Sequence, residues 1–163
     1  QVVKEMTDVH FYWAGDGQYK KQILDELDKY DNFHYLGTID YPDEVRKYLT
    51  EIDIYALPTG MDTTPLSCRE AMAMKKPIIG TSVGGIPEMI YHEKTGFLVG
   101  EGDYQAWIKN IRLLIHDREL AKKLGDEARK LLLEKFNWDI VAKKFVVVAE
   151  TYMSEQKSKS LPK

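Results

Sequence analysis

The stretch DTTPLSCREAMAMKKPIIGTSVGGIPE, residues 62–88, decides how this chain folds. An apolar run at residues 52–57, typical of a short buried strand, leads through a turn-rich loop to Thr64-Pro65. Thr64 suits the N-cap of a helix, and Pro65 suits the first helical position because proline has no N–H to leave unpaired. The stretch therefore predicts a strand, a loop and a helix in succession.

The N-terminus of this predicted helix offers a place for an anion. The amides of Leu66, Ser67 and Cys68 lack intrahelical acceptors and lie at the positive end of the helix dipole. A phosphate group binds well at such a position. Glu70 adds a carboxylate one turn further on. This layout suits the diphosphate and the ribose of a nucleotide.

Short apolar strands alternate with helices, which predicts an α/β fold with a parallel sheet covered by helices on both faces. Residues 1–153 are expected to form one domain, and the polar residues 154–163 (SEQKSKSLPK) a flexible tail. Strands are expected at residues 9–14, 33–36, 54–57, 77–80 and 96–99, and helices at residues 19–30, 42–52, 65–74, 87–91, 105–116, 119–136 and 139–153.

Glycine-rich or polar loops follow four of the expected strands. Ligands of open parallel sheets bind beyond the carboxyl ends of the strands, so these loops predict the position of a site. They are residues 15–17 (Gly-Asp-Gly), 37–38 (Gly-Thr), 59–64 and 81–85.

Composition limits the possible functions. The net charge of −3, from 23 basic and 26 acidic residues, gives no electrostatic footprint for nucleic acid. The single cysteine, Cys68, excludes an internal disulfide and fits the reducing cytoplasm. No Gly-x-Gly-x-x-Gly follows a strand and opens a helix, which disfavours a nicotinamide dehydrogenase.

Several segments, in order, resemble the C-terminal, donor-binding domain of retaining glycosyltransferases of the GT-B fold. The similar group is glycosyltransferase family 4, which carries two carboxylates separated by seven residues. The resemblance implies a Rossmann-like, three-layer domain and covers the chain from about Val9 to Trp138. Its segments are WAGDGQ (13–18), YLGTI (35–39), IYALPT (54–59), EAMAMKKPIIGTSVGGIPEMI (70–90), TGFLV (95–99) and FNW (136–138).

The resemblance implies roles for the residues around the predicted helix start. Glu70 would bind the ribose hydroxyls of a nucleotide sugar, and Asp62, the first carboxylate, would contact the donor sugar as the catalytic residue. The amides of Leu66 and Ser67 would receive the diphosphate, with Thr64 and Pro65 bordering it.

The resemblance also places the nucleotide base against Thr38 and Ile39, with Gly15 close by. No metal ion is expected, and the donor would be a UDP- or GDP-linked sugar rather than an ADP-linked one. Transfer would occur on the face from which the diphosphate departs. The implied function is transfer of a hexose in glycan, glycolipid or polysaccharide synthesis, in the cytoplasm and with a possible peripheral membrane contact.

Three departures from the family pattern bear on function. Asp62 replaces the usual Glu and is shorter by roughly 1.5 Å, one C–C bond. Lys75 stands where the family has Gly; if its backbone is left-handed, a side chain there costs of order 1 kcal/mol. The family's first strand, with its basic residues, and its N-terminal acceptor domain would precede Gln1. The chain alone is therefore expected to bind nucleotide weakly and to transfer no sugar.

Other interpretations remain open at this stage. Asp62 and Ser67 could simply satisfy backbone amides of the loop and the helix, and Gly84-Gly85 could be only a tight turn. A sugar-nucleotide epimerase of the same fold and a non-catalytic nucleotide-binding or regulatory domain are the alternative functions. The carboxylate spacing disfavours the epimerase.

Overall fold

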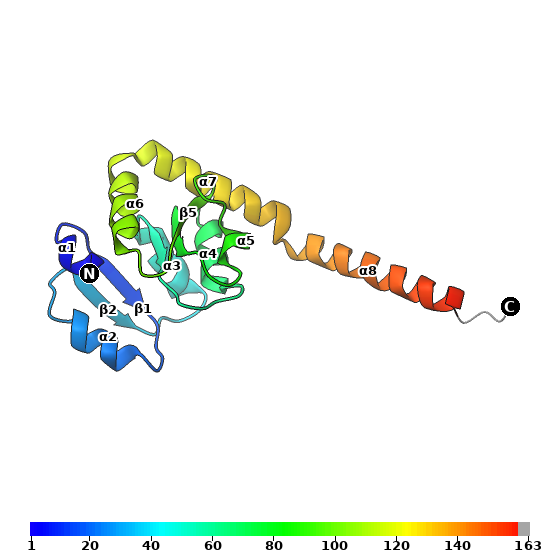
Figure 1. Cartoon of the computed structure of the whole chain (residues 1–163), viewed down its shortest axis with the longest axis horizontal. Coiled ribbons are helices and arrows are strands. Elements are labelled where there is room, and N and C mark those ends of the chain that lie inside the picture. Colours follow the sequence, from blue (N-terminus) through cyan, green and yellow to red (C-terminus); the bar gives the residue numbers. More distant parts are fainter. Residues whose placement is uncertain (160–163) are drawn as a thin grey trace.

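The structure, a computed structural model, describes residues 1–159, with side chains to residue 156 (Figure 1). Within this part of the chain the predicted alternation of strands and helices is confirmed, and a short helix, α1, precedes it. The elements are α1 (Val2–Glu5), β1 (Phe11–Ala14), α2 (Lys20–Leu27), β2 (Phe33–Gly37), α3 (Asp43–Glu51), β3 (Tyr55–Leu57), α4 (Leu66–Ala73), β4 (Ile78–Thr81), α5 (Ile86–Met89), β5 (Gly96–Val99), α6 (Tyr104–His116), α7 (Arg118–Lys135) and α8 (Trp138–Lys159).

The predicted parallel sheet is present in two pieces. β1 pairs with β2, and β3, β4 and β5 form a second sheet in that order, with every pairing parallel. From β1 the next strand, β2, is added on one side, whereas from β3 the next strands, β4 and β5, are added on the other side. The direction in which strands are added therefore reverses between β1 and β3. A hollow of about 660 Å³, here called the β1–β3 groove, lies between these two strands.

The backbone of both strands bordering the β1–β3 groove is left without a ladder partner on that side. In a parallel ladder, successive residues point their N–H and C=O groups to opposite sides. The Phe11 amide donates toward β2, and the Tyr55 amide donates toward β4. The backbone N–H and C=O groups of the next residues, Tyr12 and Ala56, therefore point into the groove. The Tyr48 hydroxyl donates to the carbonyl of Tyr12 at 3.1 Å and satisfies one of these groups.

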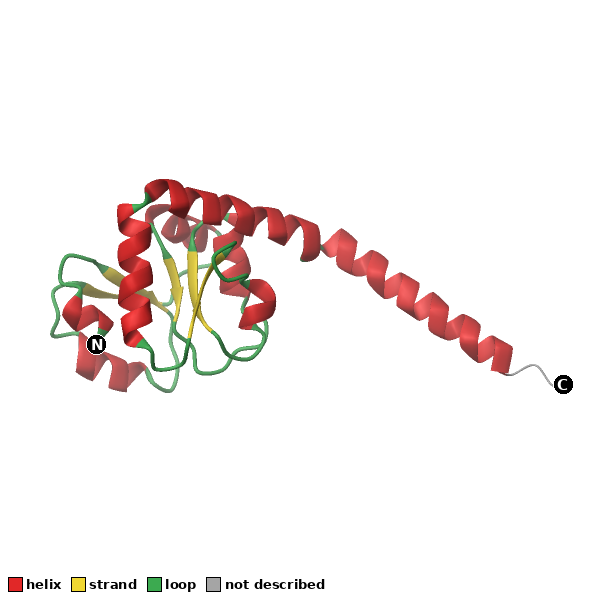
Figure 2. Ribbon diagram, turned by 45° about the horizontal axis from the view of Figure 1, so that its top comes forward, coloured by secondary structure: helices red, strands yellow, loops and turns green. Residues whose placement is uncertain are grey.

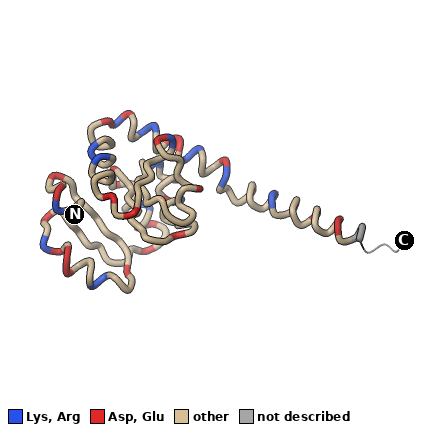
Figure 3. Tube along the Cα trace, in the orientation of Figure 1, with Lys and Arg blue, Asp and Glu red and all other residues tan. Residues whose placement is uncertain are grey.

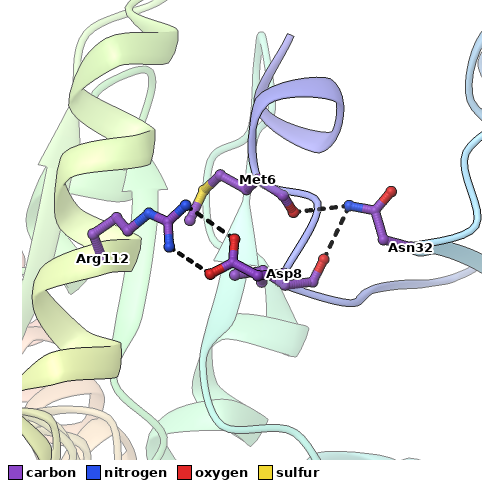
Figure 4. A network of polar contacts seen from close by, with 5 residues as sticks. Met6, Asp8, Asn32 and Arg112 are labelled. Atoms are coloured by element: carbon purple, nitrogen blue, oxygen red, sulfur yellow. Dashed lines mark hydrogen bonds and ion pairs between the residues drawn. The ribbon is translucent and has the colours of Figure 1, made fainter.

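Polar contacts from the segment before β1 connect the β1–β2 pair to the rest of the domain (Figure 4). Arg112 on α6 donates to both carboxylate oxygens of Asp8, at 2.6 and 2.9 Å. The buried Asn32 amide donates to the carbonyls of Val3, Met6 and Val9 at 2.9–3.0 Å. These bonds join the segment before β1 to α6 and to the start of β2.

The larger sheet is buried on both faces. Side chains alternate along β4, so Ile78 packs into a cluster with α4 and α5, whereas Ile79 packs into a cluster with α6. α7 contributes to both clusters, through Ala128 and Leu124 respectively. Figure 2 shows the three strands with helices packed around them. The predicted three-layer arrangement is confirmed.

Lys75, shortly after the end of α4, has a left-handed backbone with φ +57°, so the cost of a side chain at this position applies. Its ammonium group lies 2.8 Å from Asp126 on α7. Gly125 lets α7 approach closely, because a Cβ there would lie 1.9 Å from the Lys75 carbonyl oxygen.

α8 extends away from the folded body (Figures 1 and 2) and runs to Lys159. The last helix therefore ends later than the expected residue 153, and the flexible tail at residues 154–163 stays a prediction; residues 160–163 lie outside the described part. Glu, Gln and Lys in this segment are good helix formers, so polarity alone did not indicate the end of the helix. Phe145, Val148 and Tyr152 are among its exposed apolar side chains. Acidic and basic residues are interspersed over the body (Figure 3).

Candidate functional site

The N-terminus of α4 lies open at the carboxyl end of β3. The helix begins at Leu66 and not at Pro65, because Pro65 keeps an extended ψ of 123° and occupies the N-cap position. The predicted capping role of Thr64 is therefore wrong, and proline has no side-chain acceptor to replace it. Among the residues that the structure describes, no side chain forms a capping hydrogen bond at this helix start. The first amides, those of Leu66, Ser67 and Cys68, are left for an external acceptor.

Asp62 is held beside this helix start by the loop after β4. The amide of Gly85 donates to the Asp62 carbonyl at 3.0 Å. A Cβ on Gly84 would lie 2.0 Å from that same oxygen, and one on Gly85 would lie 1.8 Å from the Thr63 oxygen. The two glycines thus form the turn before α5 and also allow the Asp62 loop to lie against it.

Glu70 carries a free carboxylate close to the helix start. The side chain is half-buried, and among the described residues it has no hydrogen bond or ion pair. Its charge helps to raise the pKa of Tyr55, and the charge of Asp62 helps to raise that of Cys68, so both carboxylates lie around the first turns of α4. Glu70 is therefore available to accept hydrogen bonds from hydroxyl groups.

The buried Cys68 is not an activated thiol. Burial raises its pKa to about 12, so the thiol stays neutral despite its place in the first turn of a helix. It packs in the core with Ala71 and Met72.

Tyr55 was missed by sequence reasoning and contacts this site directly. Its hydroxyl donates to the Oγ of Ser67 at 2.7 Å. Burial raises the pKa of Tyr55 to about 12, so the phenol keeps its proton. The two residues are twelve positions apart on β3 and α4. The sequence of a strand as short as β3 does not indicate which helix its side chains will contact.

Gly15, Thr38 and Ile39 form a second group, at the carboxyl ends of β1 and β2. The Gly15 amide donates to the Gly37 carbonyl at 2.8 Å, and the Tyr35 hydroxyl donates to the Gly15 carbonyl at 3.0 Å. The structure thus brings the two predicted loops together. No hydrogen bond or ion pair among the described residues joins this group to α4.

Asp62, Ser67 and Glu70 around α4 are each partly exposed. The β1–β3 groove and a smaller hollow of about 420 Å³ beside Gly17 and Lys20 are not lined by Asp62, Ser67 or Glu70. Among the described residues, no three or more His, Cys, Asp or Glu side chains are grouped as metal ligands would be. In the same residues no helix is long and apolar enough to cross a membrane.

The fold is that of the GT-B glycosyltransferases. Solved structures with this fold match most of the chain at low sequence identity. HepE of Anabaena in complex with UDP and glucose has a TM-score of 0.75, at 18% identity, over 94% of this chain and 44% of that one. The C-terminal domain of a glycosyl transferase group 1 protein (LpcC) from Francisella tularensis has a TM-score of 0.62, at 24% identity, over 72% of this chain and 60% of that one.

The family is shown by sequence. A family model described as glycosyl transferases group 1 matches residues 1–131, and the chain belongs to this family. Sulfoquinovosyl transferase SQD2 of Arabidopsis thaliana is 31% identical over 140 residues, which are 84% of this chain and 27% of that protein. N-acetyl-alpha-D-glucosaminyl L-malate synthase of Bacillus anthracis is 31% identical over 137 residues, 84% of this chain and 35% of that protein. The chain thus spans about a third or less of these relatives.

Proposed function

We propose that this chain is the donor-binding domain of a retaining glycosyltransferase of family 4, which transfers a hexose from a nucleotide-diphosphate sugar to an acceptor. The observation that carries the proposal is the uncapped N-terminus of α4 beside the free, half-buried carboxylate of Glu70. Membership of the glycosyl transferases group 1 family supports it. So does the UDP bound by structural neighbours such as HepE.

The diphosphate binds the amides of Leu66 and Ser67, with Thr64 and Pro65 at its border. Negative charge grows on the diphosphate as the bond to the sugar breaks. Uncapped amides and the positive end of the helix dipole stabilise such charge without reorganising. The ribose hydroxyls donate to Glu70.

Asp62 contacts the donor sugar as the catalytic carboxylate. Its backbone is held against the turn at Gly84-Gly85, which fixes the loop beside the diphosphate site. The acceptor attacks from the face that the diphosphate leaves, so the configuration at the anomeric carbon is kept. A carboxylate at this point stabilises the positive charge that develops on the sugar ring.

The base lies against Thr38 and Ile39, beside Gly15, and belongs to a UDP- or GDP-linked donor. These loops are joined by the bond from Gly15 to Gly37. They lie beyond the carboxyl ends of β1 and β2, where ligands of such sheets bind. No metal cofactor is part of the proposal.

The acceptor domain and one further strand belong to a longer polypeptide. The β1–β3 groove offers unpaired backbone groups from both sides, which suits a parallel strand inserted between β1 and β3. The chain alone therefore binds nucleotide weakly and transfers no sugar. The single unpaired cysteine supports a cytoplasmic location.

The test measures the affinity of the 163-residue chain for UDP by NMR titration. Glu70→Ala is expected to weaken binding about ten-fold or more, because it removes a charged hydrogen-bond acceptor. Glu88→Ala is the matched control, since Glu88 is exposed on α5 and has no role in the proposal. Equal affinity of both variants would refute the ribose role, and absence of any UDP binding by the parent chain would refute the nucleotide site.

A further inference from the structure

The hydrogen bond between Tyr55 and Ser67 connects the sheet to the N-terminus of α4. Tyr55 lies on β3, and its ring packs against the core cluster that contains Cys68 and Met72. Its hydroxyl reaches the Oγ of Ser67 at 2.7 Å, the usual length for a bond between two hydroxyl groups. Both the amide and the side chain of Ser67 therefore lie at the uncapped end of the helix.

This bond has a direction. A phenol is a stronger proton donor than an aliphatic hydroxyl, so Tyr55 donates and the Oγ of Ser67 accepts. A phenol is protonated at neutral pH even when exposed, and burial raises the pKa of Tyr55 further, to about 12. A serine hydroxyl has one proton and two lone pairs, so Ser67 can still donate its proton to another group.

We propose that Tyr55 is a positioning residue, which holds the Ser67 hydroxyl so that its proton is donated to an anionic phosphate at the N-terminus of α4. This proposal rests on the proposed diphosphate site. Hydrogen bonds in a chain polarise one another, so Tyr55 also makes Ser67 a better donor. Tyr55 touches no substrate and acts through Ser67.

Two changes isolate the bond. Tyr55→Phe removes the hydroxyl and leaves the ring in the core. Tyr48→Phe is the matched control, because Tyr48 is a neighbouring, similarly half-buried tyrosine whose hydroxyl donates to the Tyr12 carbonyl and not to α4. Ser67→Ala removes the hydroxyl that accepts from Tyr55 and that donates to the phosphate in the proposal.

The experiment compares UDP with uridine, which lacks the phosphates, in NMR titrations of each variant. Tyr55→Phe is expected to weaken UDP binding about five-fold, the effect of one hydrogen bond, and to leave uridine binding unchanged. In the Ser67→Ala background, Tyr55→Phe is expected to have no further effect on UDP. Tyr48→Phe is expected to leave both ligands unchanged.

Each outcome decides the proposal. Unchanged UDP affinity in Tyr55→Phe, equal loss of UDP and uridine, or the same loss with and without Ser67 would overturn the role of Tyr55. In those cases UDP still binds the parent chain and the proposed function stands. Failure of the parent chain to bind UDP would overturn both.

Discussion

Replacement of Gly85 by Ala tests whether the glycine turn positions the Asp62 loop. The backbone of Gly85 has φ −89° and ψ 0°, which alanine adopts without strain, so any effect comes from the added methyl group. That Cβ would lie 1.8 Å from the Thr63 carbonyl oxygen and 2.8 Å from its carbon. Real Cβ contacts are essentially never shorter than 3.0 Å. The loop next to Asp62 must therefore retreat by more than 1 Å.

The expected effect has two parts. Overpacking of this kind lowers the free energy of unfolding by about 1–3 kcal/mol. A displacement of about 1 Å at a reacting group lowers catalysis roughly 100-fold. In the longer polypeptide, Gly85→Ala is thus expected to lower kcat/KM about 100-fold. In the chain studied here it is expected to lower Tm by roughly 3–10 °C.

Gly60→Ala is the control for both measurements. Gly60 lies in the same loop, and a Cβ there would meet only Glu101 at 3.8 Å, an ordinary contact. Calorimetry of both variants and steady-state kinetics with the nucleotide sugar are the assays. If Gly85→Ala matched Gly60→Ala in Tm and in kcat/KM, the reasoning from the close approach of the two loops would be refuted.

Three further predictions concern the rest of the fold. The free energy of unfolding of Lys75→Gly, measured in urea, is expected to exceed that of Lys75→Ala by about 1 kcal/mol. Both variants lose the exposed ion pair to Asp126, and only glycine relieves the left-handed backbone. Equal free energies of unfolding would contradict this. The hydrogen bonds from Arg112 hold the pKa of Asp8 below its usual range, so their contribution is complete above about pH 4 and is lost as the pH falls through the folded value. Between pH 7 and pH 2 the urea midpoint of unfolding should therefore fall less in Asp8→Asn than in the parent chain. Parallel pH dependences of the two midpoints would count against a stabilising ion pair at Asp8. In hydrogen exchange, the amides of Tyr12 and Ala56 should exchange faster than those of their strand neighbours that face the ladder, and equal protection would show the groove edges to be paired.

Local patterns in the sequence predicted most of the fold. Hydrophobic periodicity and the positions of glycine and proline predicted most strands and helices within a few residues, but α1 was not predicted and α8 runs past its expected end at residue 153 to Lys159. The pair Thr64-Pro65 gave the helix start but placed it one residue early, because an extended ψ at Pro65 satisfies the same pattern.

Contacts between distant segments were not predictable in this way. The bond from Tyr55 to Ser67 and the approach of Gly85 to Thr63 depend on how β3, α4 and the loop after β4 pack. The division of the sheet into two pieces depends on how distant segments pack, which neither β1 nor β3 encodes. The groups that contact the candidate site residues were therefore not predictable from the sequence, and the roles of the site residues themselves stay predictions.

A crystal structure of the chain with UDP tests the central claim most directly. The account predicts diphosphate oxygens about 2.7–3.2 Å from the amide nitrogens of Leu66 and Ser67, and the ribose hydroxyls on Glu70. UDP bound elsewhere, with the N-terminus of α4 occupied by neighbouring side chains or by water alone, would contradict it.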